Sequence, residues 1–293
     1  MSRGTDESSV AYQAWLRAAT GAGRLRRTAK RAVDEVARYQ RQQGAWVRNI
    51  DERILWDDSR IRGTDAFSQV AAQHEGNLVD KWRHYLPIYD RVLSRFRDGF
   101  VAEDGVRRPL KFLEIGVAQG GSQQLWRTYL GPDAVIYGID IEPQSAKVAD
   151  PAAGVVRVGS QADPGFLQSV VTEMGGVDVV FDDGSHIASH QRISLATLWP
   201  HLSWGGVYIC EDVHTAYWTQ FEGGLGRPGT YVEEVKTLID DMHRHYHDGE
   251  QQSQLLPARD ELGAITVFDS LVVLDKWRRP APTRSRWGRQ MFD

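Results

Sequence analysis

The chain reads LEIGVAQGGS at residues 113–122, and this stretch decides the fold class. A short apolar run ends in glycines at 116, 120 and 121, and a helical pattern follows. Glycines at a strand-to-helix junction let the backbone turn sharply and let a ligand approach the main chain at the start of the helix. The spacing is not G-x-G-x-x-G, which dinucleotide pyrophosphates require. We therefore expect a cofactor site for a ligand without phosphates.

The sequence downstream repeats this strand-then-helix texture. Short apolar runs alternate with helical stretches, which predicts βαβ units and a parallel sheet. Two final runs are joined only by Asp269-Ser270, and so short a link predicts an antiparallel hairpin. The fold class expected is α/β, a Rossmann-like class I methyltransferase sheet of five parallel strands plus a C-terminal antiparallel hairpin. The expected strands are 110–115, 135–139, 155–158, 177–181, 207–210, 264–268 and 271–274, and the expected helices are 119–129, 164–174, 187–199 and 231–247.

The first 105 residues have a different pattern. Apolar residues recur at helical spacing over 9–56 and 78–96, and nothing in 1–105 alternates like a strand. We predict an added N-terminal helical region over 1–105, which covers the active site or forms an oligomer interface. The second predicted unit is the cofactor-binding domain over 106–293, with a basic C-terminal tail. A homo-oligomer is the expected assembly.

Composition and charge narrow the cellular context. The 293 residues are 41% hydrophobic and 25% charged, which excludes a wholly disordered chain. No apolar run is long enough for a membrane span, the first residues lack a secretory pattern, and a single cysteine, Cys210, excludes an internal disulfide framework. We expect a cytoplasmic protein. The net charge is +5 for each of the two ends, residues 1–63 and 276–293, and −14 for residues 64–275. We therefore expect the basic ends to dock on an acidic body, and we predict no nucleic-acid partner.

Acidic and amide residues follow the first three strands. Glu114 precedes the first glycine and can face the cationic amino-acid end of S-adenosylmethionine, a cofactor without phosphates. Asp140 lies 24 residues beyond Gly116 and suits the ribose hydroxyls; a helix N-cap or surface acid is the alternative. Gln161 and Asp163 follow the third strand and could read the adenine edge.

Carboxylates also gather after the fourth and fifth strands. The chain reads DDGSH at 182–186 and ED at 211–212, and both ends belong at the carboxyl edge of the sheet. Clustered carboxylates repel one another unless a cation is bound, and an all-oxygen ligand set favours Mg²⁺. We assign Asp183, Glu211 and Asp212 as ligands. Asp182 is either structural or closer to the cofactor.

A histidine follows this acidic turn. His186 lies three residues after Asp183, and an imidazole can accept a proton at neutral pH, which makes it the predicted general base. His190, one turn later, is interpreted as structural. Tyr217 and Trp218 stand before a glycine-rich stretch, so they predict either a lid over the acceptor or an apolar anchor for a surface loop.

These motifs occur in an order that matches a known family. The order is LEIGV with GGS, then YGID, then QAD, DDGSH, and ED with Thr215, Tyr217 and Trp218; DKWRHY at 80–85 with Tyr89 precedes them. This resembles the Mg²⁺-dependent class I sugar O-methyltransferases of antibiotic biosynthesis of the mycinamicin 2''-O-methyltransferase type. Rhamnosyl O-methyltransferases and proteins labelled cephalosporin hydroxylase belong to the same superfamily. The resemblance covers about residues 74–275.

The resemblance implies an enzyme that transfers a methyl group from S-adenosylmethionine to a sugar hydroxyl of a glycosylated small molecule. It implies that Mg²⁺ is held by Asp183, Glu211 and Asp212, and that His186 is the base. The cofactor set is then Glu114, Gly116, Gly120, Ser122, Asp140, Gln161, Asp163 and Asp182, and the acceptor set His84, Tyr85, Tyr217 and Trp218. Two alternatives stay open: an Fe(II) oxygenase that uses Asp183, His186 and Glu211, and a non-catalytic subunit.

Overall fold

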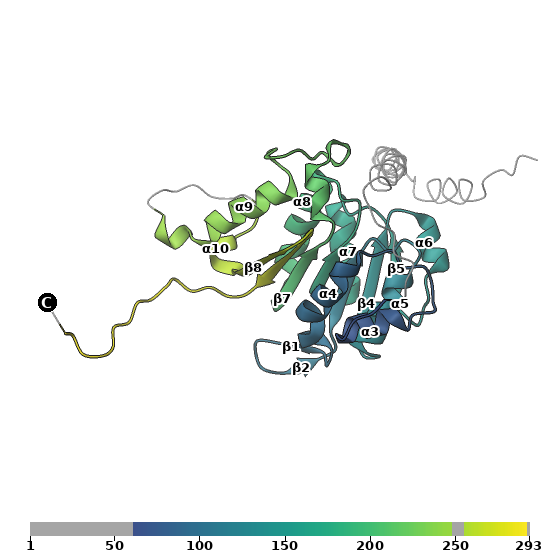
Figure 1. Cartoon of the computed structure of the whole chain (residues 1–293), viewed down its shortest axis with the longest axis horizontal. Helices are drawn as coiled ribbons and strands as arrows, with labels where there is room; N and C mark the ends of the chain where they lie inside the picture. The colour runs from purple at the N-terminus through teal and green to yellow at the C-terminus, as the bar shows by residue number, and fades with distance from the viewer. Residues whose placement is uncertain (1–60, 248–254, 292–293) are drawn as a thin grey trace, which may run out of the picture.

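The protein is described by a computed structural model that covers residues 61–247 and 255–291. A seven-stranded sheet forms its centre, with the strand order β5-β4-β3-β6-β7-β9-β8 (Figure 1). The strands are β3 (Lys111–Ile115), β4 (Val135–Asp140), β5 (Val155–Val158), β6 (Val177–Asp182), β7 (Leu202–Cys210), β8 (Leu262–Phe268) and β9 (Leu271–Lys276).

The strand pairing confirms the predicted sheet. Strand β3 pairs in parallel with β4 and β6, β4 with β5, and β6 with β7, whereas β9 runs antiparallel to both β7 and β8. The class I methyltransferase arrangement of five parallel strands and a C-terminal hairpin is therefore confirmed. Because the strands β3 and β6 lie side by side, the glycine loop and the DDGSH segment emerge at the same edge.

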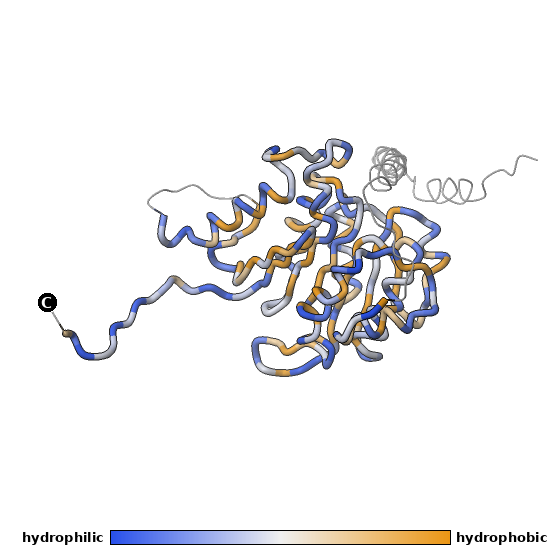
Figure 2. The backbone as a smooth tube through the Cα atoms, in the orientation of Figure 1, coloured by the Kyte–Doolittle hydropathy of each residue, from blue (hydrophilic) through white to orange (hydrophobic). Residues whose placement is uncertain are grey.

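Helices cover both faces of the sheet, and the strand side chains alternate between the two layers. Leu113 and Ile115 pack among the helices α7 and α8 and the later helix α9, whereas Phe112 packs against α4 and α5. Figure 2 shows the apolar residues concentrated along the central strands. The helices are α3 (Ala66–Ala72), α4 (Leu86–Leu93), α5 (Gly121–Leu130), α6 (Pro143–Val148), α7 (Pro164–Met174), α8 (Ala188–Leu198), α9 (Tyr231–Met242) and α10 (Ala258–Glu261).

The helices that precede the sheet share its core. Phe67 of α3 contacts Trp126 of α5 with ring centroids 5.0 Å apart, and Tyr89 of α4 contacts Phe181 of β6 at 5.4 Å. The predicted helical region 1–105 includes one short strand near its end, since β1 (Phe100–Val101) pairs with β2 (Arg107–Arg108). A two-residue strand is too short to show alternation. The predicted helix over 9–56 lies outside the described residues.

One predicted helix begins later than expected. The spacing predicts a helix from residue 78, but Leu78 is 71% exposed, and the segment becomes helical only at η1 (Arg83–Tyr85), followed by α4 and η2 (Ser94–Phe96). Pro87 explains the start, because proline is tolerated in the first turn of a helix and clashes inside one. Residues 76–82 are instead neither helix nor strand, and they pass the start of α5, where Gly121 lies against the Asn77 and Leu78 carbonyls.

Some of the described connections contain short 3-10 turns. Helix α9 ends at Met242 rather than at the predicted 247, and the chain continues into η6 (Arg244–Tyr246). The others are η3 (Trp199–His201), η4 (Val213–Tyr217) and η5 (Thr219–Phe221). The tail after β9 extends away from the body (Figure 1), although Arg278 near its start contacts Glu103 at 2.7 Å. Among the helices that the structure describes, none combines the length and the apolar character needed to cross a bilayer.

Candidate active site

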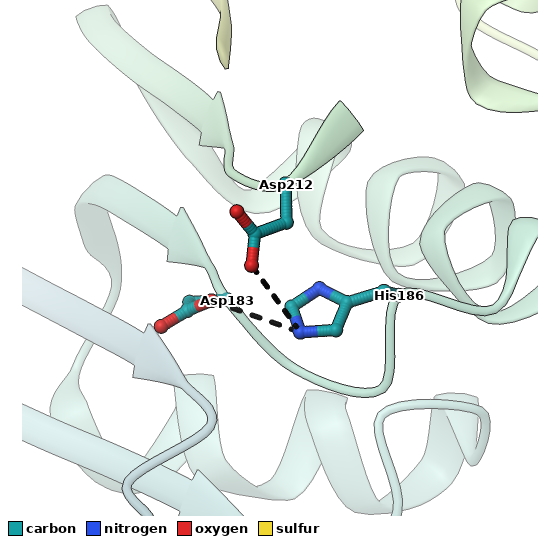
Figure 3. A group of neighbouring side chains, drawn as sticks. All are labelled: Asp183, His186 and Asp212. Carbon is teal, nitrogen blue, oxygen red and sulfur yellow. Dashed lines mark ion pairs between the residues drawn. The ribbon is translucent and has the colours of Figure 1, made fainter. Parts of the chain in front are cut away.

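Three predicted residues converge at the carboxyl edge of the sheet. Asp183 and His186 lie on the turn after β6, and Asp212 lies two residues after β7. The His186 Nε2 atom is 3.9 Å from the Asp183 Oδ1 atom and 3.8 Å from the Asp212 Oδ2 atom, as Figure 3 shows. One ligand atom of each residue lies within 4.8 Å of the others. This geometry can hold a metal ion.

The backbone at two of these residues is strained. His186 has φ +57° and Asp212 has φ +54°, both in the left-handed region that side-chain-bearing residues seldom adopt. Such conformations persist only where the surrounding structure imposes them, and they concentrate at functional sites. The Thr215 hydroxyl helps to impose them, because it donates to the Asp212 carbonyl at 2.8 Å and to the His186 carbonyl at 3.3 Å.

Glu211, the third predicted metal ligand, faces other partners. Its Oε1 atom lies 3.0 Å from the Lys81 Nζ atom, and its Oε2 atom accepts from the Tyr89 hydroxyl at 2.8 Å. The Lys81 ammonium also pairs with Asp183. Among the described residues, the group of possible ligands is therefore Asp183, Asp212 and His186. Glu211 is not part of this group.

Burial and mutual repulsion govern the charges of this cluster. Burial raises the pKa of Glu211 well above its usual range, and the neighbouring Asp183 carboxylate adds to that rise. The pKa of Asp183 is also raised, by burial first, while Lys81 opposes the shift. A divalent cation would relieve both effects, because it stabilises the ionised carboxylates. This group of carboxylates and an imidazole is thus suited to bind a metal ion.

Three further residues belong to the site: Lys81, Tyr85 and Tyr89. The sequence motif predicted no individual role for Lys81 or Tyr89, and it predicted contact with the acceptor for Tyr85. Tyr85 is predicted to contact the acceptor, yet its side chain is fully buried and its hydroxyl donates to the Asp212 Oδ1 atom at 2.7 Å. Tyr89 supports Glu211 in the same way. Tyr85 and Tyr89 are four residues apart in the helical stretch 83–93, so their spacing predicts one shared face. Lys81 precedes that stretch, and no helical spacing points to it.

A cavity at the same edge has a lining that suits the cofactor. It is lined by the glycine-loop residue Gly116, by Asp140 after β4, by Gln161 after β5, and by Gly184 and Ser185 of the DDGSH turn. Apolar walls come from the side chains of Ile115, Ile139, Ile141 and Ile187. A Cβ atom on Gly116, which has φ +92°, would lie 2.0 Å from the Asp183 carbonyl oxygen. Glycine is therefore required where the loop passes the DDGSH turn.

Two of the cavity's polar residues also shape its walls. The Asp140 carboxylate accepts from the amides of Val117 and Ala118 at 3.0 and 2.8 Å, so it fixes the glycine loop. The Gln161 Oε1 atom accepts from the Ser185 amide at 2.6 Å, and its Nε2 atom donates to Asp182 at 3.1 Å. Gln161 thereby ties the end of β5 to the DDGSH turn.

The other predicted cofactor residues do not line this cavity. Glu114 is fully buried on the opposite side of β3, where it accepts from the Trp126 indole at 2.8 Å, and burial raises its pKa to about 7. Asp163 caps α7 through the amides of residues 165 and 166. Asp182 accepts from Tyr208 and Ser194 at 2.5 and 2.7 Å. Gly120 is the N-cap of α5, and Ser122 lies in its first turn.

Aromatic residues surround the carboxylate cluster. Tyr217 is 49% exposed, the side chain of His84 is 41% exposed, and the Trp218 ring lies 4.9 Å from the His214 ring. Trp82, absent from the predicted acceptor set, contacts the same His214 ring at 5.8 Å. Tyr217 and His84 are thus accessible at the surface, whereas Tyr85 is buried.

Comparisons with known proteins agree with this geometry. The profile of a family described as "Methyltransferase domain" matches residues 113–213, from the glycine loop to just past Asp212. The 8-demethyl-8-(2-methoxy-alpha-L-rhamnosyl)-tetracenomycin-C 3'-O-methyltransferase of Streptomyces olivaceus is 32% identical over 275 residues, which cover 84% of this chain and 66% of the relative. The chain belongs to the family of the sugar O-methyltransferases of antibiotic biosynthesis.

Further members of this sugar O-methyltransferase family show the same relation. The mycinamicin VI 2''-O-methyltransferase of Micromonospora griseorubida is 34% identical over 206 residues, 66% of this chain and 48% of the relative. A crystal structure of the MycE methyltransferase of the mycinamycin pathway, in complex with Mg and SAH, matches with a TM-score of 0.62 and 29% identity over 74% of this chain and 56% of that chain. The chain therefore spans about half to two thirds of the length of these relatives.

Proposed function

We propose that this chain is an S-adenosylmethionine- and Mg²⁺-dependent O-methyltransferase that acts on a sugar hydroxyl of a glycosylated natural product. The observation that carries the proposal is that the cofactor cavity and the carboxylate cluster share one turn of the chain. Gly184 and Ser185 line the cofactor cavity, while their neighbours Asp183 and His186 belong to the carboxylate cluster. The tetracenomycin and mycinamicin relatives support the sugar as acceptor.

The chain's own residues suit the adenosyl part of the cofactor. Isoleucine side chains form apolar walls for a planar base, and Asp140 lies where the ribose of a nucleoside belongs at the end of the second parallel strand. No phosphate is present in S-adenosylmethionine, which agrees with a loop that lacks the dinucleotide spacing. Once bound, the cofactor supplies an activated methyl group and the cation supplies a Lewis acid for the acceptor oxygens.

We infer that His186 acts as the general base. Its imidazole is 7% exposed, and the carboxylates of Asp183 and Asp212 lie just below 4 Å from its Nε2 atom. The ring would accept the proton of the acceptor hydroxyl at neutral pH. The acceptor oxygen would bond to the methyl carbon as the bond between that carbon and the cofactor sulfur breaks, so that S-adenosylhomocysteine leaves with the electron pair and the proton stays on His186. The chain contributes by orientation and by exclusion of water.

The acceptor would approach from the aromatic side of the cluster. Tyr217, Trp218 and His84 offer ring faces and edges there, and Trp82 adds one more. Such rings stack on the apolar faces of sugars and leave the hydroxyl groups directed to polar partners. The proposed homo-oligomer, the cytoplasmic location and the role of residues 1–105 as an active-site cover or oligomer interface belong to the same proposal.

The first test distinguishes two roles for His186, general base and metal ligand. His186→Ala should cut turnover on a panel of sugar acceptors by about 10²–10⁴-fold, while Mg²⁺ affinity measured by calorimetry stays within threefold of the wild type. His201→Ala, which removes an exposed histidine at the far end of β7, is the matched control and should change neither. Near-normal turnover of the folded His186→Ala variant would remove the base assignment, and equal losses of turnover and Mg²⁺ affinity would make His186 a ligand instead.

The cofactors are tested on the wild-type protein. EDTA should abolish methyl transfer, detected by mass spectrometry, and Mg²⁺ should restore it. Turnover that needs iron and oxygen without S-adenosylmethionine would favour the oxygenase alternative, for which the structure supplies Asp183, His186 and Asp212 rather than the predicted set with Glu211. Failure to bind S-adenosylhomocysteine in calorimetry would favour the non-catalytic alternative.

A further inference from the structure

The carboxylate cluster already contains a cation of the chain's own. Lys81 reaches it from the non-helical segment 76–82, and its side chain is only 8% exposed. Its ammonium pairs with Asp183 and lies 3.0 Å from the Glu211 Oε1 atom. The same Nζ atom lies 5.5 Å from the centre of the Phe181 ring, which faces it from β6. Lys81 is therefore built into the site.

The position of Lys81 has opposite effects on the two states of the cluster. Without a metal, the ammonium offsets two buried carboxylates whose charges would otherwise be uncompensated. With a metal, the same ammonium contacts a carboxylate that also serves the cation, and like charges at close range in a partly buried site repel strongly. An interaction of this kind changes a binding constant by tenfold or more.

We propose that Lys81 is an internal counter-cation that sets the Mg²⁺ affinity of the cluster. It keeps Asp183 and Glu211 in place in the metal-free protein and competes with the divalent cation for them. Glu211 shows the competition most clearly, because both of its oxygens are engaged, by Lys81 and by Tyr89, away from the group formed by Asp183, His186 and Asp212. The inference rests on the proposed function in taking Mg²⁺ as the cation.

A purely structural ion pair would predict the reverse. If Lys81 only held the site together, its loss would loosen the carboxylates and weaken metal binding. The proposal requires that its loss weakens the metal-free protein and strengthens metal binding. The sign of the change in affinity therefore distinguishes the two roles, and no measurement of turnover is needed.

The experiment compares Lys81→Met with the wild type by calorimetry with Mg²⁺ and by thermal unfolding with and without it. Methionine keeps an apolar stem against Phe181 and removes the charge. The expected result is at least tenfold tighter Mg²⁺ binding, a lower Tm without metal, and a larger rise in Tm on adding Mg²⁺. Lys111→Met is the matched control; Lys111 starts β3 at the other end of the sheet and bonds to the Gly175 carbonyl, so Mg²⁺ affinity should stay unchanged.

Each outcome decides the question. A folded Lys81→Met protein that binds Mg²⁺ as weakly as the wild type, or more weakly, overturns the inference and leaves the proposed function intact. If neither protein binds Mg²⁺, the proposed function loses its metal and the inference falls with it. If Lys81→Met does not fold, Lys81→Gln takes its place under the same criteria, because its amide can still donate to Glu211 without carrying charge.

Discussion

Replacing Gly116 with alanine tests how closely the cofactor loop and the metal turn are packed. An alanine at φ +92° costs at least the 1–2 kcal/mol or so of the left-handed region. Its Cβ atom would also lie 2.0 Å from the Asp183 carbonyl oxygen, whereas a carbon approaches such an oxygen to about 3.3 Å. The loop and the turn must therefore separate by roughly 1 Å, and a misplacement of about 1 Å can cost about 10²-fold in rate.

Gly105→Ala supplies the matched control, because Gly105 has φ +78° and nothing within 4 Å of its added Cβ. Urea unfolding should show a loss of about 1–2 kcal/mol for the control and a larger loss for Gly116→Ala. Calorimetry with S-adenosylhomocysteine should show an unchanged affinity for the control and a loss of at least tenfold for Gly116→Ala, with turnover down about 10²-fold. A Gly116→Ala protein whose affinity and turnover stay within threefold of the wild type would refute this reasoning.

Two further predictions follow from buried polar groups. Burial raises the pKa of Glu114 from its usual 4.5 to about 7, so the folded state keeps a proton that the unfolded state releases. The unfolding free energy of the wild type relative to Glu114→Gln should therefore fall by about 3 kcal/mol as the pH rises from 4.5 to 8, and a flat difference in urea unfolding would contradict this. Tyr85→Phe removes the 2.7 Å bond to Asp212 and should weaken Mg²⁺ binding about tenfold in calorimetry. Tyr129→Phe, which loses a 2.8 Å bond to Asp90 elsewhere, should lower stability alone; equal Mg²⁺ affinities for the two variants would count against the role of Tyr85.

The strands were predictable because strands that are buried on both faces consist mainly of apolar residues. Runs such as 177–182 are apolar over most of their length, as strands covered on both faces must be, and every predicted strand has its counterpart in the sheet. Helix ends were less predictable. The apolar spacing over 78–96 suits a helix throughout, but Pro87 allows one to begin only shortly before it, and Leu78 is left exposed.

The site was predictable where it follows strand ends. Asp183, His186 and Asp212 lie directly after β6 and β7, and neighbouring parallel strands end at one edge, so their convergence follows from topology. Side-chain partners did not follow from topology. Glu114 points to the face of β3 opposite the cavity, because a strand alternates its side chains between two faces and the order of residues does not say which face the ligand uses. Asp182 lies beside the cavity residue Gln161, but its carboxylate is engaged by buried donors.

The order of short motifs by itself determined the fold class, the family and the edge of the sheet where chemistry takes place. These properties depend on local periodicity and on the rule that parallel strands share a direction. Only the tertiary structure decided that Lys81, Tyr85 and Tyr89 support carboxylates more than 100 residues away, with Lys81 on Glu211 and Asp183, Tyr85 on Asp212 and Tyr89 on Glu211. The physical reason is that a buried charge interacts with the groups nearest to it in space, and separation along the chain does not predict which groups those are.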